Sequence, residues 1–368
     1  MINIMQIPFL DLKTINDPYI KEVNQALTEC VNSGWYVLGK QVEKFEQSYA
    51  AFCESTYCVG LANGLDAITL LLRAYDFPKG AEVIVPANTY IASILGILNA
   101  GLAPIFVEPN ASNYLLNEGL VEDKITDKTK AILAVELYGK CGDLVKLRGI
   151  ADKYNLKLVS DNAQSHGATY LKKPSINWLD AATYSFYPTK NLGAMGDAGA
   201  VISNDLHIIE RLRHLRNYGS LIKYQFDFQG INSRLDEMQA AILNVKLPYL
   251  KSQLNRRRAI AKRYLTEIQS DWVSLPPSDS IDEDAWHLFV IKSSVRESLR
   301  EYLRKKGIGT DVHYPVPPHK QPAMTAYKHL TFPITENLHC EVLSIPMNHT
   351  LSDEHVTYVI TTLNDFEP

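Results

Sequence analysis

Between about residues 57 and 205, short apolar segments alternate with longer segments that have helical periodicity. DAITLLLRAY and DLVKLRGIADKYN are two of the helical segments, with apolar residues spaced to line one face of a helix. The apolar segments that predict strands are YCVGLA, EVIVPA, APIFVE, KAILAVEL, LKLVSDNA and ATYSFYP. Alternation of this kind predicts the α/β class, with a large, mostly parallel mixed sheet covered by helices.

The segments on either side of this region have a different character. Residues 17–50 are predicted to be helical, with Gly34 and Gly39 in the break between two helices. After residue 206, LHIIERLRHLRNYG and residues 233–268 predict long helices, and Ser233 with Asp236 resembles a capping box at the start of the second.

The C-terminal part alternates again, over shorter segments. HLFVIK and LSIPM predict strands, whereas SVRESLREYLRKKG and DEHVTYVITTLNDF predict helices. We therefore divide the chain into a large domain over residues 1–250, which includes the N-terminal helical segment, and a small α+β domain over residues 251–368.

Composition excludes several classes of protein. Of the 368 residues, 46% are hydrophobic and 21% charged, which is typical of a globular chain. The net charge of −4 offers no basic excess for a nucleic-acid backbone. The 5 cysteines form no C-x-x-C pair, so we expect no disulfide framework or zinc ribbon and a reducing, cytoplasmic location. The N-terminal MINIMQIPFLDLK lacks the basic and apolar regions of a signal peptide.

One uncharged stretch, from Val83 to Val107, is long enough to span a membrane. Pro86, Asn88 and Pro104 interrupt it, and it divides more simply into a strand VIVP, a helix TYIASILGILNAG and a strand APIFV. Buried parallel strands read as continuous apolar runs. We therefore expect a buried βαβ unit and no contact with a membrane.

Three polar positions follow predicted strands, where the ligands of α/β proteins bind. Asp161 ends LVSD, Lys190 follows ATYSFYP, and Asn63-Gly64 lies between YCVGLA and a helix. Each has a simpler interpretation when it is taken alone. Asp161 can begin a turn or cap a helix, Lys190 can be a surface lysine in a glycine-rich loop, and Asn63-Gly64 can be a plain turn.

Taken together, the three positions match the needs of pyridoxal 5′-phosphate. The N–H groups at a helix start bind phosphate, and glycine permits close approach. A desolvated lysine loses its proton and becomes the amine nucleophile of a Schiff base. A carboxylate keeps the pyridinium nitrogen of the cofactor protonated. The sequence therefore predicts a pyridoxal phosphate site and no metal, because His313 and His319 have no third ligand nearby.

Longer motifs carry a resemblance to a known family over nearly the whole chain. The strings, in order, are IPFLDLK, GWYVLGKQVEKFE, ANGLDAI, VIVPANTYIAS, VELYGKCGD, DNAQSHGATY, SFYPTKNLGAMGDAGAV, LRNYG, NSRLDEMQAAIL and HYPVPPHKQPAM. The chain resembles the DegT/DnrJ/EryC1/StrS nucleotide-sugar aminotransferases. This resemblance implies the aspartate aminotransferase type I fold.

The resemblance also implies roles for individual residues. Lys190 would hold the cofactor and then move the proton as the catalytic residue. The other implied cofactor contacts are Asp161 at the ring nitrogen, Gln164 near the phenolic oxygen, Tyr90 stacked on the ring, and Asn63, Gly64, Leu65, Ser185 and Asn232 at the phosphate. Asn232 would come from a second subunit, which implies a homodimer with shared active sites.

Two positions bear on the reaction. Many relatives have Thr at position 65, and the Leu found here resembles enzymes acting on 3-keto sugars. Position 190 is Lys rather than the His of the dehydrase branches, which favours transamination. The implied reaction moves an amino group from L-glutamate to C3 of a dTDP-3-keto-6-deoxyhexose, giving 2-oxoglutarate and a dTDP-3-amino-3,6-dideoxyhexose.

For the sugar pocket we predict aromatic and imidazole side chains, which offer both hydrogen bonds and apolar faces. The predicted residues are Tyr36, Tyr187, Tyr224, His313 and Tyr314. With 20 Tyr in the chain, a purely structural role is the alternative for each. The alternatives left open for the protein are a C4 aminotransferase acting on a UDP-, GDP- or dTDP-4-keto sugar, and a non-catalytic regulator with the same fold.

Overall fold

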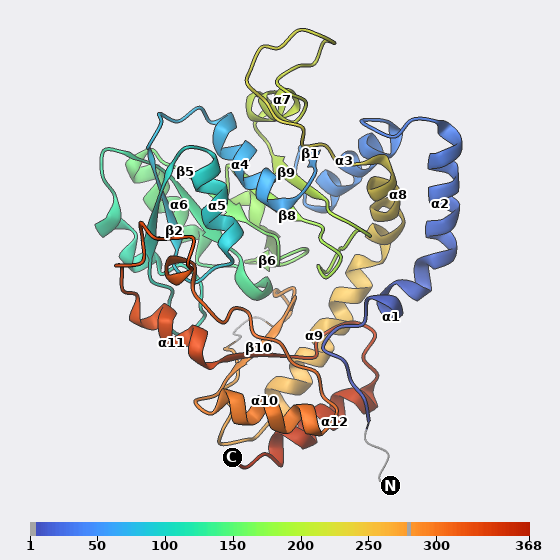
Figure 1. Cartoon of the computed structure of the whole chain (residues 1–368), viewed down its shortest axis with the longest axis vertical. Helices are drawn as coiled ribbons and strands as arrows, with labels where there is room; N and C mark the ends of the chain where they lie inside the picture. The colour runs from blue at the N-terminus through green and yellow to red at the C-terminus, as the bar shows by residue number, and fades with distance from the viewer. Residues whose placement is uncertain (1–4, 278–280) are drawn as a thin grey trace.

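The computed structural model describes residues 5–277 and 281–368, so the first four residues of the predicted large domain lie outside the described part. Its centre is a seven-stranded sheet with the strand order β1-β9-β8-β5-β4-β2-β3, which confirms the α/β class (Figure 1). The strands are β1 (Tyr57–Leu61), β2 (Glu82–Pro86), β3 (Ala103–Val107), β4 (Thr129–Val135), β5 (Lys157–Asp161), β8 (Ala181–Ser185) and β9 (Gly199–Ser203).

One strand of the seven runs against the others. β9 pairs antiparallel with both β1 and β8, whereas β8, β5, β4, β2 and β3 pair parallel. Six strands therefore bring their carboxyl ends to the same edge of the sheet. β9 was not among the predicted strands, because its sequence GAVIS directly continues the glycine-rich stretch after Lys190.

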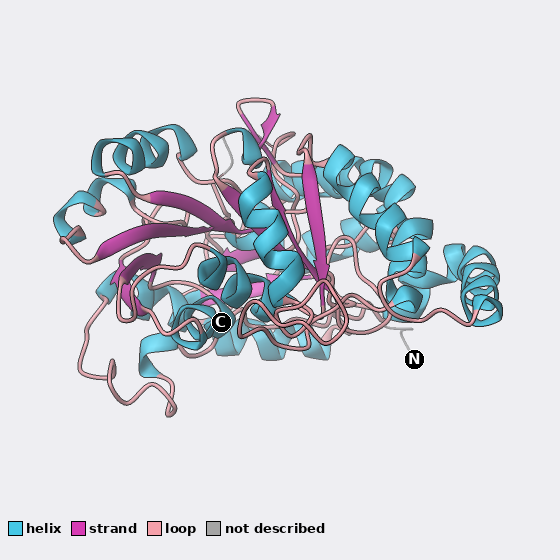
Figure 2. Ribbon diagram, turned by 90° about the horizontal axis from the view of Figure 1, so that it is seen from above, coloured by secondary structure: helices cyan, strands magenta, loops and turns pink. Residues whose placement is uncertain are grey.

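Alternate residues of each strand enter two separate cores, as the two-residue period of a strand requires. Val83 and Val85 pack on one face with α4 (Gly64–Ala74), α5 (Ile91–Asn99) and α7 (Leu206–Leu215). Ile84 packs on the other face with α3 (Lys40–Phe52), α6 (Leu144–Tyr154) and α8 (Glu237–Lys246). Helices thus cover both sides of the strands (Figure 2).

The predicted helical segment at the N-terminus is confirmed and divided by its glycines. It contains a short 3-10 turn, Asp17–Tyr19, followed by α2 (Ile20–Ser33) and α3, and a further short helix, α1 (Leu12–Asn16), precedes the predicted range. Gly34 caps α2 with a left-handed φ of 65°, which glycine adopts without strain. Gly39 is the N-cap of α3.

The C-terminal part lies below the large sheet in Figure 1, and α9 (Leu250–Glu267) runs into it. Its strands β10 (Phe289–Lys292) and β11 (Val342–Ile345) pair antiparallel. They lie with α10 (Arg296–Lys305), α11 (Pro333–Glu341) and α12 (Asp353–Asn364). The division of the chain at residue 250 coincides with the start of α9 and stays a prediction.

Residues 233–268 do not form the one long helix that the sequence predicted. The segment contains α8, a 3-10 turn over Leu247–Tyr249 and then α9, because Pro248 lacks the N–H that a continuous helix needs. The predicted capping box is also wrong. Ser233 Oγ accepts a hydrogen bond from the N–H of Ala62 at 3.2 Å, and Asp236 is the N-cap.

The uncharged stretch from Val83 to Val107 forms β2, α5 and β3, as expected. Within residues 5–277 and 281–368, no helix is both long and apolar enough to cross a membrane.

Candidate active site

The carboxyl ends of neighbouring strands bring three predicted residues to one edge of the sheet. Asp161 is the last residue of β5 and Ser185 the last of β8. Asn63 follows β1 and caps α4, its side-chain oxygen accepting a hydrogen bond from the N–H of Asp66 at 2.8 Å. Ligands of α/β sheets bind at this edge.

The start of α4 forms a cradle for an anion. The first N–H groups of a helix have no partner within it, and they sit at the positive end of the helix dipole. A Cβ at Gly64 would lie 2.7 Å from Ser185 Cβ, and one at Gly199 would lie 2.3 Å from the carbonyl carbon of Asn63. Only glycine fits at either position, so bare backbone faces Asn63 and Ser185. The cradle fits a phosphate group.

Lys190 lies in the loop that follows β8, with its backbone N–H donating to the carbonyl of Tyr187 at 2.8 Å. Burial among protein atoms disfavours the ammonium and lowers the pKa of Lys190 to about 8, while the charge of Asp161 acts in the opposite direction. An appreciable fraction of this amine is therefore neutral near physiological pH. A neutral amine is the form that attacks a carbonyl carbon.

Asp161 is buried and held by two hydrogen bonds. Its Oδ2 accepts from Ser93 Oγ at 2.7 Å, and its Oδ1 accepts from the N–H of Ala163 at 3.1 Å. Burial raises the pKa of Asp161, against the effects of these bonds and of the Lys190 charge. A buried carboxylate of this kind is stabilised by a cation placed against it. A protonated ring nitrogen would supply that cation, so the residue fits its predicted role.

His166 links the cradle to the protein interior. Its Nε2 lies 2.8 Å from the carbonyl oxygen of Ser185 and its Nδ1 lies 2.7 Å from Tyr49 Oη. Because a carbonyl only accepts, Nε2 carries the proton and Nδ1 accepts from the tyrosine hydroxyl. Burial lowers the pKa of His166 to about 3, so the ring stays neutral and fixes the end of β8.

Aromatic residues surround the predicted cofactor contact Gln164. Its Oε1 accepts from the N–H of Tyr138 at 2.6 Å and its Nε2 donates to Tyr314 Oη at 3.0 Å. The ring of Tyr314 lies 5.0 Å from that of Tyr90, which is 52% exposed. The structure therefore brings Gln164, Tyr90 and Tyr314 together, as a ring-stacking site requires.

His313 and Tyr187 also belong to this site. The charge of Lys190 contributes, after burial, to a lowered pKa of His313, whose Nδ1 lies 2.9 Å from Ser344 Oγ. Tyr187 is 50% exposed and its carbonyl accepts from Lys190. The His313 imidazole and the backbone of Tyr187 therefore lie close to Lys190.

Three predicted residues lie apart from the others in this chain. Tyr224 is 80% exposed, on the loop after α7 that projects from the top of the molecule in Figure 1. Tyr36 lies in the turn between α2 and α3, and its hydroxyl donates to the carbonyl of Val31 at 3.2 Å. Asn232 is exposed and pairs with Asn217. Among the described residues, no hydrogen bond, ion pair or ring contact joins these three side chains to Lys190.

The sequence analysis missed Ser93, His166 and Gly199. Thr89 and Ser93, hydrogen-bonded at 2.8 Å, are polar residues within an otherwise apolar helical stretch, and that signal could have identified Ser93. Gly199 belongs to the glycine-rich sequence after Lys190. For His166 the sequence offers no local signal, because Tyr49 lies 117 residues away.

Comparison with known proteins places this site in a family. A model of the DegT/DnrJ/EryC1/StrS aminotransferase family matches residues 18–364. A dTDP-3-amino-3,6-dideoxy-alpha-D-galactopyranose transaminase of Aneurinibacillus thermoaerophilus is 49% identical to this chain over 360 residues. Those residues cover 98% of this chain and 99% of the relative.

Solved structures agree with the sequence comparison. DesV of S. venezuelae, solved in complex with a ketimine intermediate, matches with a TM-score of 0.94 at 41% identity over 98% of both chains. NtdA of Bacillus subtilis, solved with bound PMP, matches with a TM-score of 0.91 at 31% identity, over 97% of this chain and 84% of that one. The predicted fold type is thereby confirmed. The protein belongs to the DegT/DnrJ/EryC1/StrS aminotransferase family, whose members depend on pyridoxal 5′-phosphate.

Proposed function

We propose that the protein transfers an amino group from L-glutamate to C3 of a dTDP-3-keto-6-deoxyhexose, with 2-oxoglutarate as the other product. The observation that carries this proposal is the pairing of Lys190, whose pKa is lowered to about 8, with the buried carboxylate of Asp161. The phosphate cradle at Gly64 completes the set of groups that the cofactor needs.

Pyridoxal phosphate, when bound, supplies an aldehyde and an electron-withdrawing ring that together make amino transfer feasible. The residues of this chain would hold it at three points. The start of α4 and Ser185 would bind the phosphate, Asp161 would bind the ring nitrogen, and Lys190 would bind through its amine. Released from that bond, the Lys190 amine would accept a proton from the donor carbon in the first half-reaction and donate a proton to C3 of the sugar in the second.

Ser93 and His166 act as positioning residues in this scheme. Ser93 donates to Oδ2 of Asp161, and the N–H of Ala163 donates to Oδ1. These two hydrogen bonds determine the orientation of the carboxylate. His166 fixes the carbonyl of Ser185, and with it the wall of the cradle. Rigid partners of this kind hold a reacting centre in place without reorganisation during the reaction.

The substrate is proposed on two grounds. Tyr187, His313 and Tyr314 offer hydrogen-bonding groups and apolar faces, which suit a sugar and a pyrimidine ring. The Aneurinibacillus relative, at 49% identity, is named for a dTDP-3-amino-3,6-dideoxyhexose. The alternative is a C4 aminotransferase acting on a UDP-, GDP- or dTDP-4-keto sugar.

We further propose a homodimer in which Tyr36, Tyr224 and Asn232 serve the active site of the partner. In one chain these residues are exposed. Apolar side chains around them are also exposed, including Leu221 at 57%, Ile222 at 62% and Phe226 at 62%. Exposed apolar surface of this extent is typical of a protein interface. A cytoplasmic location is supported by the cysteines, all five of which are free thiols.

The substrate proposal is tested by product analysis with defined sugars. The enzyme is incubated with L-glutamate and either a dTDP-3-keto- or a dTDP-4-keto-6-deoxyhexose, and the amino sugar and 2-oxoglutarate are measured by mass spectrometry. The two C4 configurations of the 3-keto sugar are supplied as separate substrates. We expect product from the 3-keto sugar. Product from the 4-keto sugar alone would establish the alternative.

A matched variant separates sugar binding from the donor reaction. His313→Asn keeps a hydrogen-bonding side chain but changes the shape of the sugar pocket. We expect it to raise KM for the keto sugar while the half-reaction with glutamate proceeds at its normal rate. Equal losses in both half-reactions would remove His313 from the sugar pocket.

A further inference from the structure

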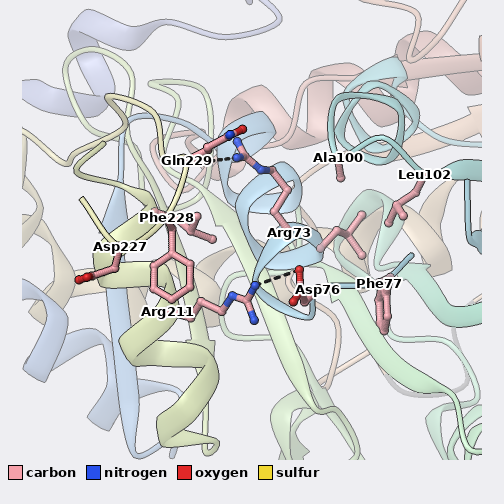
Figure 3. A pocket seen from close by; sticks show the side chains of 11 residues that line it. Arg73, Asp76, Phe77, Ala100, Leu102, Arg211, Asp227, Phe228 and Gln229 are labelled. Carbon is pink, nitrogen blue, oxygen red and sulfur yellow. Dashed lines mark hydrogen bonds and ion pairs between the residues drawn. The ribbon is translucent and has the colours of Figure 1, made fainter. Parts of the chain in front are cut away.

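A separate cavity lies at the far end of α4 from the phosphate cradle. Its volume is about 390 Å³, and it is enclosed by the last turn of α4, the residues after α5, α7 and residues 227–229 (Figure 3). None of the residues assigned above to cofactor or sugar lines it. A cavity of this size accommodates a small organic molecule.

Two arginines from different helices face this cavity. Arg73 of α4 donates a hydrogen bond to the carbonyl of Gln229, and Arg211 of α7 forms an ion pair with Asp76 at 3.0 Å (Figure 3). A guanidinium has five N–H donors. Within the described part of the chain, the hydrogen bond of Arg73 and the ion pair of Arg211 use only part of this set on each arginine. Planar guanidinium groups bind carboxylate and phosphate in pairs of parallel hydrogen bonds.

The negative charges nearby leave the cavity open to an anion. The side chain of Asp76 is 74% exposed, so its ion pair with Arg211 contributes little and is readily exchanged. Asp227 also lines the cavity, and its carboxylate lies 3.5 Å from His214 Nδ1. The lining thus holds two arginines and two carboxylates, of which Asp76 is in an exposed ion pair and Asp227 lies against His214.

The opposite wall of the cavity is apolar. Leu72, Phe77 and Leu102 line it. We propose that this cavity binds a small organic anion, with a carboxylate or phosphate head between Arg73 and Arg211 and a short apolar body against Phe77 and Leu102.

The same arginines hold the projecting segment 217–232. The ring of Phe228 lies 5.1 Å from the guanidinium carbon of Arg211, and Gln229 is the residue bound by Arg73. The two ends of the segment meet where Asn217 pairs with Asn232. An anion bound to both Arg73 and Arg211 thus restrains the two side chains that contact Phe228 and Gln229, and with them the segment. Its effect on transamination rests on the proposed role of Asn232, whereas the binding itself does not.

Calorimetry on the protein loaded with pyridoxal phosphate tests the site, because the cofactor then fills the phosphate cradle. The probes are phenyl phosphate, inorganic phosphate and benzylamine. We expect one phenyl phosphate per chain, weaker binding of inorganic phosphate, and no binding of benzylamine. Absence of phenyl phosphate binding, or binding of benzylamine in its place, overturns the proposal.

Variants locate the binding. Arg73→Gln and Arg211→Gln should each weaken phenyl phosphate binding by about tenfold or more, the effect of losing a charge-assisted hydrogen-bonded pair. The matched control is Arg213→Gln, which changes an arginine of α7 that does not line the cavity. This variant should bind phenyl phosphate with normal affinity. Equal affinity in all three variants overturns the proposal.

A further variant keeps both arginines and fills the cavity with a larger side chain. Ala100 lines the cavity from the end of α5 and has ordinary helical backbone angles, so Ala100→Phe places a ring in the cavity. It should abolish phenyl phosphate binding. In the unsubstituted protein, phenyl phosphate should slow amide exchange in residues 217–232. Unchanged binding by Ala100→Phe contradicts the site, and unchanged exchange contradicts the coupling to the segment.

Discussion

The amine of Lys190 has a lowered pKa because its surroundings exclude water, and this has a direct kinetic consequence. Attachment of pyridoxal phosphate to the cofactor-free protein requires the neutral amine. We expect the attachment rate to rise with pH and to level off above about 8. Stopped-flow absorbance measures this rate. A midpoint near the ordinary lysine value of about 10.4 would contradict the account.

Asp161→Asn offers a check on the cause of the pKa shift. The charge of Asp161 raises the pKa of Lys190, against the larger effect of burial. Removing that charge should move the midpoint of the attachment rate to lower pH. A shift to higher pH would show that the two residues do not interact as described.

Glu136 is a second buried group whose charge state affects the protein. It follows β4, is 1% exposed, and its pKa is raised to about 8 by burial, with smaller contributions from Asp284 and Asp161. The folded protein retains this proton over a pH range in which the unfolded chain releases it. The contribution of Glu136 to the free energy of unfolding therefore falls as pH rises from about 4.3 to about 8.

Glu136→Gln should remove this pH dependence, because an amide does not ionise. Urea denaturation at several pH values measures the free energy of unfolding. We expect the variant to gain stability relative to the unsubstituted protein as pH rises to about 8, with no further gain above it. Glu43→Gln, exposed on α3, is the control and should show no such trend. A constant difference across this range would refute the assignment.

At the residue scale, the sequence predicts best those groups whose role depends on neighbours along the chain. Lys190 and Asp161 follow apolar strands directly, so their position at the sheet edge could be inferred. Ser233 was assigned wrongly because its hydroxyl binds Ala62, 171 residues away. The residues next to Ser233 in the sequence carry no information about a hydrogen-bond partner so far along the chain.

At the scale of elements, α3 is positioned by a carboxylate from another helix. Glu237 of α8 is buried, and it accepts hydrogen bonds from the N–H groups of Gly39 at 2.9 Å, Gln41 at 3.0 Å and Val42 at 2.8 Å. These are the orphan donors at the start of α3. One side chain thus fixes the angle between α3 and α8.

Glu237→Gln tests the energetic role of this cap. An amide keeps the shape but offers one acceptor oxygen in place of two, which leaves a buried N–H group unsatisfied. We expect the free energy of unfolding to fall by about 1–3 kcal/mol and amide exchange at residues 39–42 to increase. Glu210→Gln, exposed on α7, serves as the control. Unchanged exchange at residues 39–42 would show that the cap does not hold α3.

Element prediction succeeded where hydrophobic periodicity was strong and failed where a distant residue decides the boundary. β1 to β5, β8 and α4 to α6 were all predicted from local pattern. The helix α11 was missed because a residue from the large sheet caps it. The carboxylate of Glu108 accepts from the N–H groups of Ile334 at 2.8 Å and Thr335 at 3.0 Å.

At the scale of the whole molecule, the proposed dimer makes a prediction about mixed subunits. Lys190→Ala removes the amine from one site, and Asn232→Asp places a negative charge against the phosphate of the partner site. If the sites are shared, a mixed dimer of these two variants has one intact site. Subunit exchange should then restore about one quarter of the normal activity from two inactive proteins. A mixture that stays inactive after confirmed exchange would contradict sharing.

The central claim is that Lys190 and Asp161 form a pyridoxal phosphate site that accepts an amino group from glutamate. Visible absorbance of the purified protein tests it most directly, with Lys190→Ala as the inactive variant and Lys251→Ala as the matched control. We predict a yellow protein that bleaches with L-glutamate and recovers its colour with 2-oxoglutarate, in Lys251→Ala but not in Lys190→Ala. A protein that stays colourless after pyridoxal phosphate is added would contradict the account.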